Sequence, residues 1–454
     1  MKHSIIRFIN VLILYKSNKM KKKEAFGWSL IVLISFLPAI IWYFFKPYKE
    51  ITLNYGNLTH ILGQLSGLIG MTLFSLTFLL AARLKFIEDL FEGLDKVYVV
   101  HRVVGGSALV LIMMHPIFLV LKFIPSNVSL AATYLLPGTL MSINFGIFAL
   151  LVMILLIYLT LYSKMKYNTW KFSHKFLSLV FIFAVLHIFL VKGDASQDSI
   201  FTGYYIYATI VSLIGGISML YIVFVNTMKL RETRYKIDSV DRSKDGVYAI
   251  TMSPEQNPIK YKAGQFVFLR VYNEGIPKEQ HPFSIASKTN SPQLKVVIKN
   301  LGDYTSQLIN LKSGSKVTIE GPYGRFNKSS VSDQIWVAGG IGITPFLGMA
   351  ADLNEKIGYD IDLYYSVKSS DEFISLDYLK SVEKMTNGKF RVIPWVSNEI
   401  GFLGIKGVLE KSKNVKNKEF YLCGPAALKD SILKGALALG VSKNRIYSEE
   451  FNFR

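Results

Sequence analysis

The chain shows two patterns of hydrophobicity, one on each side of residue 230. Before that point lie six apolar runs, each long enough to cross a hydrocarbon core of about 30 Å, which takes about 20 helical residues. These runs are residues 27–45, 58–82, 97–123, 139–162, 172–191 and 202–227. They predict a bundle of six transmembrane helices over residues 27–230, preceded by a basic segment over residues 1–26.

After residue 230 the apolar positions come in short runs separated by glycine and proline. Alternating segments such as GVYAITM, QFVFLRV and LKVVIKN predict an antiparallel β-barrel over residues 231–329. From residue 330 to residue 454 the apolar strands IWVAGG, DIDLYYSV, FRVIPWV and EFYLCG alternate with helical stretches. This alternation predicts a doubly wound parallel sheet. The expected fold class is therefore a membrane α-helical bundle followed by an α/β module.

Lysine and arginine gather beside alternate ends of the apolar runs. They occupy the N-terminal segment, the links over residues 83–96 and 163–171, and residues 229–234. Because positively charged links lie on the cytoplasmic side, we expect a multi-pass protein of the cell membrane with its N-terminus and its second half in the cytoplasm. The net charge of +20 reflects this asymmetry, since no nucleic-acid-binding motif is present. No cleavage site follows the first apolar stretch, so no removable signal peptide is expected.

Four histidines lie on just two of the predicted spans. His101 and His115 are 14 residues apart on the third, and His174 and His187 are 13 residues apart on the fifth. At a rise of 1.5 Å per residue, each interval covers roughly 20 Å, most of the hydrocarbon thickness. Since both spans start from the cytoplasm, the histidines form two level-matched pairs, which predicts two bis-histidine iron sites. The alternative is hydrogen bonding between helices, which is common for a single intramembrane histidine.

The spacing on the fifth span conflicts with a straight helix. At about 100° per residue, a step of 14 residues returns within about 40° of the starting face, whereas a step of 13 misses it by about 140°. A bend, a π-bulge or a rotated haem must absorb this difference. His60, at the outer end of the second span, is either part of a terminal acceptor site or an interfacial histidine in contact with water, and the latter is favoured.

Two short motifs in the barrel region have polar groups suited to a flavin. The tetrapeptide His281-Pro282-Phe283-Ser284 lies at a predicted strand, where the phenyl ring can flank a flavin and the hydroxyl can bond to its polar edge. Gly302-Asp303-Tyr304-Thr305 opens a predicted helix, whose free N–H groups suit a pyrophosphate. For the second motif, simple N-capping by Asp303 or Thr305 is the favoured alternative.

The last third of the chain contains a glycine turn between a strand and a helix. Gly339-Gly340-Ile341-Gly342-Ile343-Thr344 follows IWVA and lets a phosphate approach the backbone, although it departs from the G-x-G-x-x-G pattern. Lys368 follows the next strand, where it either pairs with a ribose 2′-phosphate or is an ordinary surface lysine.

The end of the fourth strand and the end of the chain add two more candidates. Cys423-Gly424-Pro425 follows EFYL, and the thiol either lies near a nicotinamide or fills the core. As the only cysteine, Cys423 also excludes a disulfide framework and a thiolate metal cluster. Phe451 either covers a flavin face or anchors the chain end.

Together these motifs resemble the NADPH oxidase and ferric reductase superfamily, and within it the compact prokaryotic NADPH oxidases. The resemblance covers approximately residues 55–454 and implies a ferredoxin-NADP reductase-like module with an FAD domain and an NAD(P)H domain. The segments that carry it are HRVVGGSALVLIMMH, HKFLSLVFIFAVLH, HPFSIAS, GDYT, GPYG, VAGGIGITPF, YSVK, YLCGP and EEF.

The resemblance also implies which residues hold each cofactor. An inner b-type haem is expected between His101 and His174, and an outer one between His115 and His187. The residues expected at FAD are His281, Pro282, Phe283, Ser284, Gly302, Asp303 and Thr305. The residues expected at the nicotinamide donor are Gly339, Gly340, Gly342, Thr344, Lys368, Cys423, Gly424 and Pro425, with Phe451 over the flavin ring. Many relatives have arginine where Lys368 stands, so the donor is either NADPH or NADH.

The implied activity is electron transfer from NAD(P)H through FAD and two haems to dioxygen outside the cytoplasm, giving superoxide and hydrogen peroxide. A ferric or cupric reductase that uses a ferric chelate would have the same cofactors, so the acceptor stays open. A transporter or haem-based sensor is a third possibility, although no broken spans, internal repeats or midplane charges are seen. Because no regulatory module precedes the membrane half, no obligate regulatory protein is expected.

Overall fold

The computed structural model describes residues 22–45, 54–124, 126–162, 165, 167–191, 199–243, 246–327 and 332–449. It divides into two compact units. One comprises Lys22–Phe91 and Lys96–Met228, and the other is formed mainly by Lys229–Arg454.

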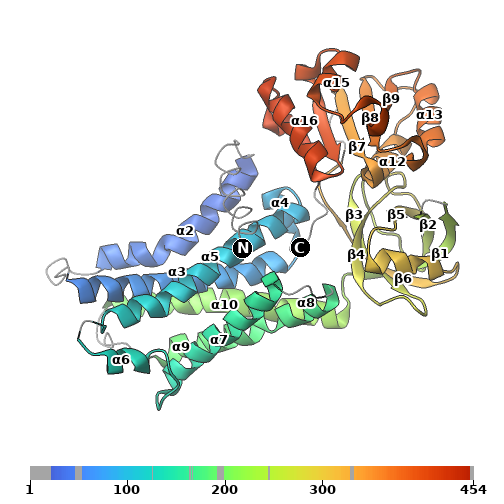
Figure 1. The fold of residues 1–454 in the computed structure, drawn as a ribbon. Coiled ribbons are helices and arrows are strands. Elements are labelled where there is room, and N and C mark those ends of the chain that lie inside the picture. Colours follow the sequence, from blue (N-terminus) through green and yellow to red (C-terminus); the bar gives the residue numbers. More distant parts are fainter. Residues whose placement is uncertain are drawn as a thin grey trace. The chain divides into compact units, whose positions relative to one another are not determined.

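The first unit is a bundle of apolar helices (Figure 1). Within the described residues, six helical segments are long and apolar enough to cross a membrane, as the hydrophobic pattern predicts. They are α2 (Lys22–Phe45), α3 (Tyr55–Ala81), α5 (Leu94–Leu121), α7 (Met141–Tyr162), α8 with α9 (Tyr167–Lys175 and Leu177–Leu190) and α10 (Ser199–Met228). The short helices α4 (Lys85–Phe91) and α6 (Val128–Thr133) were not predicted. The predicted membrane bundle is confirmed.

Three glycines on one side of α3 allow α5 to pack closely against it. A Cβ added to Gly63 would stand 2.7 Å from the Leu119 side chain, and one added to Gly70 would stand 2.8 Å from that of Ile112. Between them, Gly67 faces His115. Small residues in such a row are a common device for joining transmembrane helices, because they let backbones approach.

The fifth span is two helices rather than one. Helix α8 ends at Lys175 and α9 begins at Leu177, with Phe176 in a turn between them. The backbone N–H of Phe176 bonds to the Ser173 carbonyl at 3.0 Å, a tighter turn than an α-helix makes. The break lies between His174 and His187, whose 13-residue spacing conflicts with a straight helix that aims both rings the same way.

The second unit begins with an antiparallel sheet of six strands. Their order is β4-β3-β6-β1-β2-β5, and an antiparallel bridge from Ile285 to Val296 joins the two edges into a barrel. The strands are β1 (Glu232–Arg242), β2 (Val247–Pro254), β3 (Phe266–Tyr272), β4 (Gln280–Ser284), β5 (Leu294–Lys299) and β6 (Lys316–Tyr323). Apolar side chains such as Ile250, Leu269 and Ile319 fill the barrel, which confirms the sequence pattern.

A parallel sheet of five strands follows, in the order β11-β10-β7-β8-β9. The strands are β7 (Gln334–Gly339), β8 (Ile361–Val367), β9 (Phe390–Val396), β10 (Glu419–Cys423) and β11 (Ile446–Ser448). The helices are α12 (Thr344–Ala351), α13 (Leu376–Met385), α14 (Ser397–Ile400), α15 (Ile405–Lys411) and α16 (Ala426–Ala438). The predicted doubly wound sheet is confirmed, and the short edge strand β11 was not foreseen.

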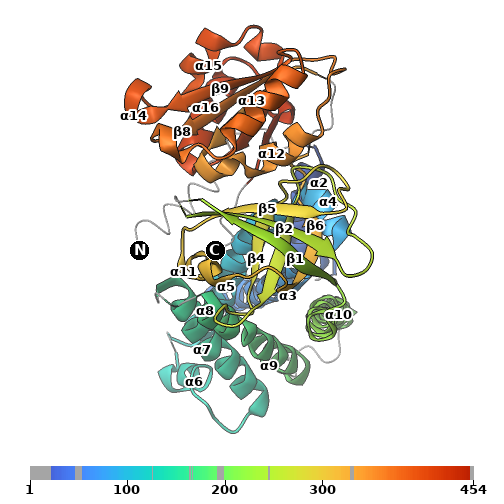
Figure 2. The same cartoon turned by 90° about the vertical axis from the view of Figure 1, so that its right-hand side faces the viewer.

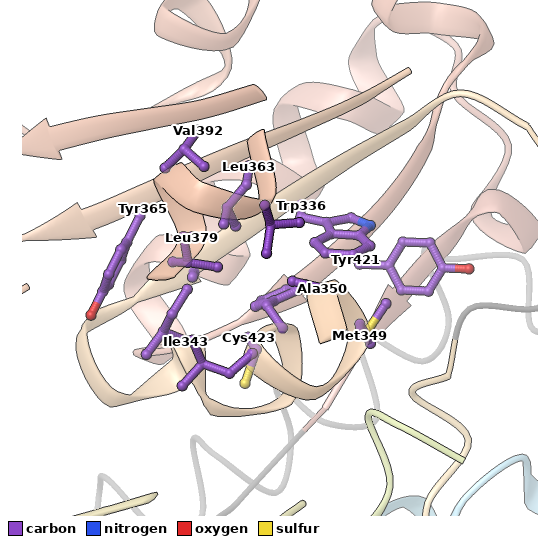
Figure 3. Packing of buried hydrophobic residues seen from close by; sticks show 14 of the residues in the cluster. Trp336, Ile343, Met349, Ala350, Leu363, Tyr365, Leu379, Val392, Tyr421 and Cys423 are labelled. Atoms are coloured by element: carbon purple, nitrogen blue, oxygen red, sulfur yellow. The ribbon is translucent and has the colours of Figure 1, made fainter. Parts of the chain in front are cut away.

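Each face of this sheet has its own core. Trp336, Leu363 and Tyr365 belong to one cluster, which also contains Ile343 and Cys423 (Figure 3). Their chain neighbours Ile335, Val337 and Tyr364 belong to the cluster on the opposite face. Strands buried on both faces lose the alternation of a half-exposed strand.

Helix α12 connects the parallel sheet to the barrel (Figure 2). A Cβ on Gly348 would lie 2.8 Å from the Ile285 carbonyl oxygen of the barrel, so only glycine fits there without a shift. The Asp352 carboxylate, just after α12, accepts a hydrogen bond from the Thr289 backbone N–H at 2.9 Å and another from the Thr289 hydroxyl. Backbone packing and a charged acceptor thus fix the two lobes to each other.

Candidate functional site

The structure brings the four intramembrane histidines together as two pairs between α5 and the α8–α9 span. The ring centres of His101 and His174 are 6.3 Å apart, and those of His115 and His187 are 6.2 Å apart. If both imidazoles of a pair were to bind one metal ion, a metal–nitrogen bond of about 2.0–2.1 Å and about 1.1 Å from that nitrogen to the ring centre would allow ring centres up to about 6.3 Å apart. The ring-centre separations of both pairs are therefore compatible with one iron bound between the two imidazoles.

Hydrogen bonds orient three of these rings. His115 Nδ1 lies 2.7 Å from the Gly63 carbonyl oxygen, and His187 Nδ1 lies 2.7 Å from that of Ser142. His101 Nδ1 lies 3.1 Å from the Thr77 carbonyl oxygen. Because a carbonyl only accepts, each Nδ1 carries the proton, and Nε2 keeps a lone pair for a metal.

Two glycines make room for the rings of the outer pair. A Cβ on Gly67 would stand 2.6 Å from His115 Nδ1, and one on Gly146 would stand 2.8 Å from His187 Nδ1. Both distances are too short for real contacts, so α3 and α7 each form a recess in which one imidazole lies. Within the described residues, no group of three or more His, Cys, Asp or Glu could hold a metal ion.

His174 is held differently from the other three. Its Nδ1 is buried and has no hydrogen-bond partner in the part of the chain that the structure describes. Trp170, one turn earlier on α8, stacks on the imidazole with 5.4 Å between ring centres and 24° between planes. His60 lies on α3 three residues before Gly63 and belongs to neither pair.

In the barrel, His281 of β4 stacks on Tyr304 with 3.8 Å between ring centres. His281 Nε2 lies 2.8 Å from the Glu279 carboxylate. The Tyr304 hydroxyl is buried and has no hydrogen-bond partner among the described residues, and its burial raises the pKa of that phenol. Pro282 and Phe283 are partly buried, while Ser284 is buried. A buried hydroxyl that lacks a partner is a donor available to a bound ligand.

The helix that starts at Asp303 uses its own side chains as caps. The Thr305 hydroxyl accepts hydrogen bonds from the backbone N–H groups of Leu301 and Gly302, at 2.9 and 3.0 Å. The Asp303 carboxylate accepts from Tyr304 N at 2.9 Å. Local capping therefore engages these three amides.

The glycine turn lies where the ends of β7 and β10 meet. A Cβ on Gly342 would lie 2.5 Å from the Cys423 carbonyl oxygen, one on Gly339 would lie 2.6 Å from Pro425, and one on Gly424 would lie 2.9 Å from the Gly339 Cα. Side chains at these positions would push the strand ends apart. Gly340 differs, because its φ of +53° favours glycine and no atom lies within 4 Å of where its Cβ would be. The open backbone at Gly340, at the start of a helical turn, is suited to approach by an anion.

The remaining predicted residues differ in exposure. Thr344 is buried and donates its hydroxyl hydrogen to the Ile341 carbonyl, and Lys368 is exposed after β8. Cys423 is fully buried in the cluster that also contains Ile343 and Tyr421 (Figure 3). Burial raises the pKa of its thiol well above the ordinary value, so the group is a neutral thiol. Phe451 lies outside the described residues.

Two features of these sites were missed in the sequence. Both carboxylate oxygens of Glu449 are buried without a hydrogen-bond partner among the described residues, and burial raises the pKa of that carboxyl well above its usual range. Trp170 was passed over, although its spacing of four residues from His174 places it on the same helix face. For Glu449 no local pattern distinguishes a buried acid from an exposed one near a chain end.

Three family models match successive parts of the chain. They are described as "Ferric reductase like transmembrane component" over residues 66–185, "FAD-binding domain" over 233–327 and "Oxidoreductase NAD-binding domain" over 336–434. The chain has the domain architecture of the ferric reductase and NADPH oxidase superfamily. The three matched models support the predicted transmembrane oxidoreductase with an FAD-binding and an NAD-binding domain.

The curated relatives and solved structures each match less than half of this chain. A probable dihydroorotate dehydrogenase B electron transfer subunit of Pyrococcus abyssi is 34% identical over 177 residues, which are 38% of this chain and 62% of the relative. The flavohemoprotein of Candida norvegensis is 26% identical over 219 residues, which are 46% of this chain and 55% of the relative. The chain thus spans less than two thirds of both. The flavohaem-like FAD/NAD-binding domain of Vibrio cholerae nitric oxide dioxygenase aligns with 48% of this chain and 97% of its own, at 21% identity and a TM-score of 0.42.

Proposed function

We propose that this superfamily member is a transmembrane NAD(P)H oxidase that passes electrons through FAD and two b-type haems to dioxygen on the extracytoplasmic side, giving superoxide and hydrogen peroxide. The observation that carries the proposal is the separation of the two histidine pairs, 6.3 and 6.2 Å between ring centres. When bound, FAD takes a hydride from the nicotinamide and each haem iron carries one electron at a time.

In the membrane, the chain itself would position the histidine ligands of the haems and exclude water from them. His101 with His174 would hold the inner haem, and His115 with His187 the outer. Donation from Nδ1 to the Gly63 and Ser142 carbonyls fixes two rings and makes their Nε2 atoms better donors. The spans that carry these histidines consist mostly of apolar residues, which would keep water away from both pairs.

In the second unit, formed mainly by Lys229–Arg454, the residues would bind and orient FAD and the nicotinamide donor. His281, Pro282, Phe283 and Ser284, with the start of α11 (Asp303–Gln307), would position FAD. The backbone amides that follow Gly339 would bind the pyrophosphate of the donor, and Lys368 would meet the adenosine ribose. Cys423, a buried neutral thiol, supplies shape at the nicotinamide rather than a nucleophile. Phe451 is proposed to cover the flavin.

The proposal includes an orientation of the chain in the membrane. Basic links favour a cytoplasmic N-terminus and cytoplasmic nucleotide domains in the cell membrane. The domain limits are proposed as 27–230, 231–329 and 330–454, after the basic segment 1–26. A second candidate, an NAD(P)H-dependent ferric or cupric reductase, is favoured by the description of the matched transmembrane model as ferric reductase-like.

Purified protein in detergent distinguishes the two acceptors. We expect NADPH or NADH to drive oxygen consumption, with cytochrome c reduction that superoxide dismutase abolishes. Rapid reduction of a ferric chelate with negligible oxygen uptake would instead establish the reductase. His115→Ala should remove one haem and stop both acceptor reactions, whereas His60→Ala, outside the pairs, should retain two haems.

A further inference from the structure

Phe402 is the most exposed large apolar side chain among the described residues, with 94% of its surface open to solvent. It lies in the Gly401–Gly404 loop between α14 and α15 of the second unit. The loop itself is firmly held. Leu403 is 3% exposed, Gly401 N donates to the Ser397 carbonyl at 3.0 Å, and Trp395 Nε1 donates to the Gly401 carbonyl at 2.8 Å. A fixed backbone therefore presents one flat apolar ring to solvent.

This ring lies at the edge of the sheet where nucleotides bind in doubly wound folds. In such folds ligands lie outside the carboxyl ends of the strands. The Gly401–Gly404 loop follows the carboxyl end of β9, and the glycine turn follows that of β7. Asn398 N donates to the Lys368 carbonyl at 3.2 Å, so the segments that follow β8 and β9 are in contact.

The distance suits one half of a dinucleotide. Strand β8 separates β7 from β9, and two strand spacings amount to about 10 Å. A pyrophosphate at the glycine turn would thus have its adenosine directed across β8 toward β9. The nicotinamide half would lie the other way, toward β10, Cys423 and Gly424.

We propose that Phe402 is the stacking platform for the adenine ring of the nicotinamide dinucleotide. This proposal rests on the proposed use of NAD(P)H and adds a residue that recognises it. Adenine has a large flat π face, and stacking on an exposed aromatic side chain removes apolar surface of both rings from water. Stacking on adenine does not involve the ribose 2′ position, where NADPH and NADH differ. Phe402 would therefore bind both dinucleotides equally well, and Lys368 would distinguish them.

The test uses the full-length holoenzyme and anaerobic flavin reduction. Phe402→Ala should raise the half-saturating concentration of NADPH and of NADH by about 5- to 150-fold, the range for loss of one base–aromatic stack. The limiting rate should stay within twofold. Reduced nicotinamide mononucleotide, which has no adenosine, should reduce the variant and the wild type alike. Phe402→Trp should restore dinucleotide affinity, and Ile400→Ala, a 56% exposed aliphatic control beside the loop, should leave it unchanged.

Calorimetry with ADP-ribose measures the same contact without the reaction. Weaker ADP-ribose binding by Phe402→Ala would support the stacking platform. If neither dinucleotide reduced the wild-type flavin, that failure would overturn the proposed function but not the stacking platform. Unchanged ADP-ribose affinity in Phe402→Ala would overturn the platform, as would an equal loss of rate with the mononucleotide, which indicates a structural defect.

Discussion

Gly146 offers the sharpest single test of the outer histidine pair. A Cβ at this position of α7 would stand 2.8 Å from His187 Nδ1 and 2.9 Å from its Cε1, whereas ordinary contact begins at 3.4 Å. Gly146→Ala must therefore displace the imidazole by about 0.6 Å or tilt α7 away from α9. Either movement disturbs the bond of 2.7 Å from His187 Nδ1 to the Ser142 carbonyl.

The expected result is loss of the outer haem rather than loss of the fold. Disturbing a partner of a metal ligand typically costs 10- to 100-fold in metal affinity. Alanine itself favours a helix over glycine by about 1 kcal/mol, so α7 gains intrinsic helical stability. We predict that purified Gly146→Ala contains close to one haem per chain, measured by the pyridine haemochrome method, and elutes as a folded protein in size-exclusion chromatography.

Gly216→Ala is the matched control for this experiment. Gly216 is also a glycine within a span, α10, but no atom lies within 4 Å of where its Cβ would be. This variant should keep the haem content and spectrum of the wild type. If Gly146→Ala kept two haems with an unchanged low-spin spectrum, the assignment of His187 as a fixed iron ligand would be refuted.

Three further predictions concern the second unit, and chemical denaturation checks each of them. Asp362→Ala should destabilise by about 3–5 kcal/mol, because it leaves buried Lys418, now 2.8 Å from that carboxylate, without its partner. Burial alone would raise the Asp362 pKa, but hydrogen bonds from Lys418 and Ser412 hold it below its usual value. The stability this group contributes is thus present above the ordinary pKa and should be lost as pH falls through the lowered one; a pH-independent difference between Asp362→Ala and wild type would contradict this. Glu449→Gln should stabilise more at pH 8 than at pH 5, since a raised pKa means that ionisation opposes folding as pH rises. Gly348→Ala should cost about 1–3 kcal/mol by forcing α12 off the barrel backbone, and an unchanged midpoint would show that the contact yields freely.

The pattern of hydrophobic residues was enough to predict the spans, the barrel and the parallel sheet, because the length and spacing of apolar runs follow directly from which faces of each element are buried. The 13-residue spacing of His174 and His187 also showed that the fifth span conflicts with a straight helix, and the structure has a turn there at Phe176. The sequence could not show where this helix breaks, since a helix break without proline or glycine has no strong local signal. Helices α4 and α6 and strand β11 were missed for a related reason: three to seven residues are too few for a period to appear.

The candidate site could be predicted where its chemistry needs residue types that are uncommon in that part of a protein. Four histidines in apolar spans are such a case, and the structure brings them together in the expected pairs. Gly67 and Gly146 were not predicted, because a glycine in an apolar helix indicates nothing until the ring beside it is known. Phe402 was missed because the sequence does not distinguish an exposed phenylalanine from a buried one such as Phe390.

Haem content together with anaerobic reduction tests the central claim most directly. Purified protein should contain two b-type haems per chain by the pyridine haemochrome method, and NADPH or NADH should reduce both in the absence of oxygen once FAD is bound. Exchange of His101 or His115 for alanine should each remove one haem. A preparation that binds haem at neither histidine pair, or whose haems stay oxidised with a reduced flavin, would contradict the account.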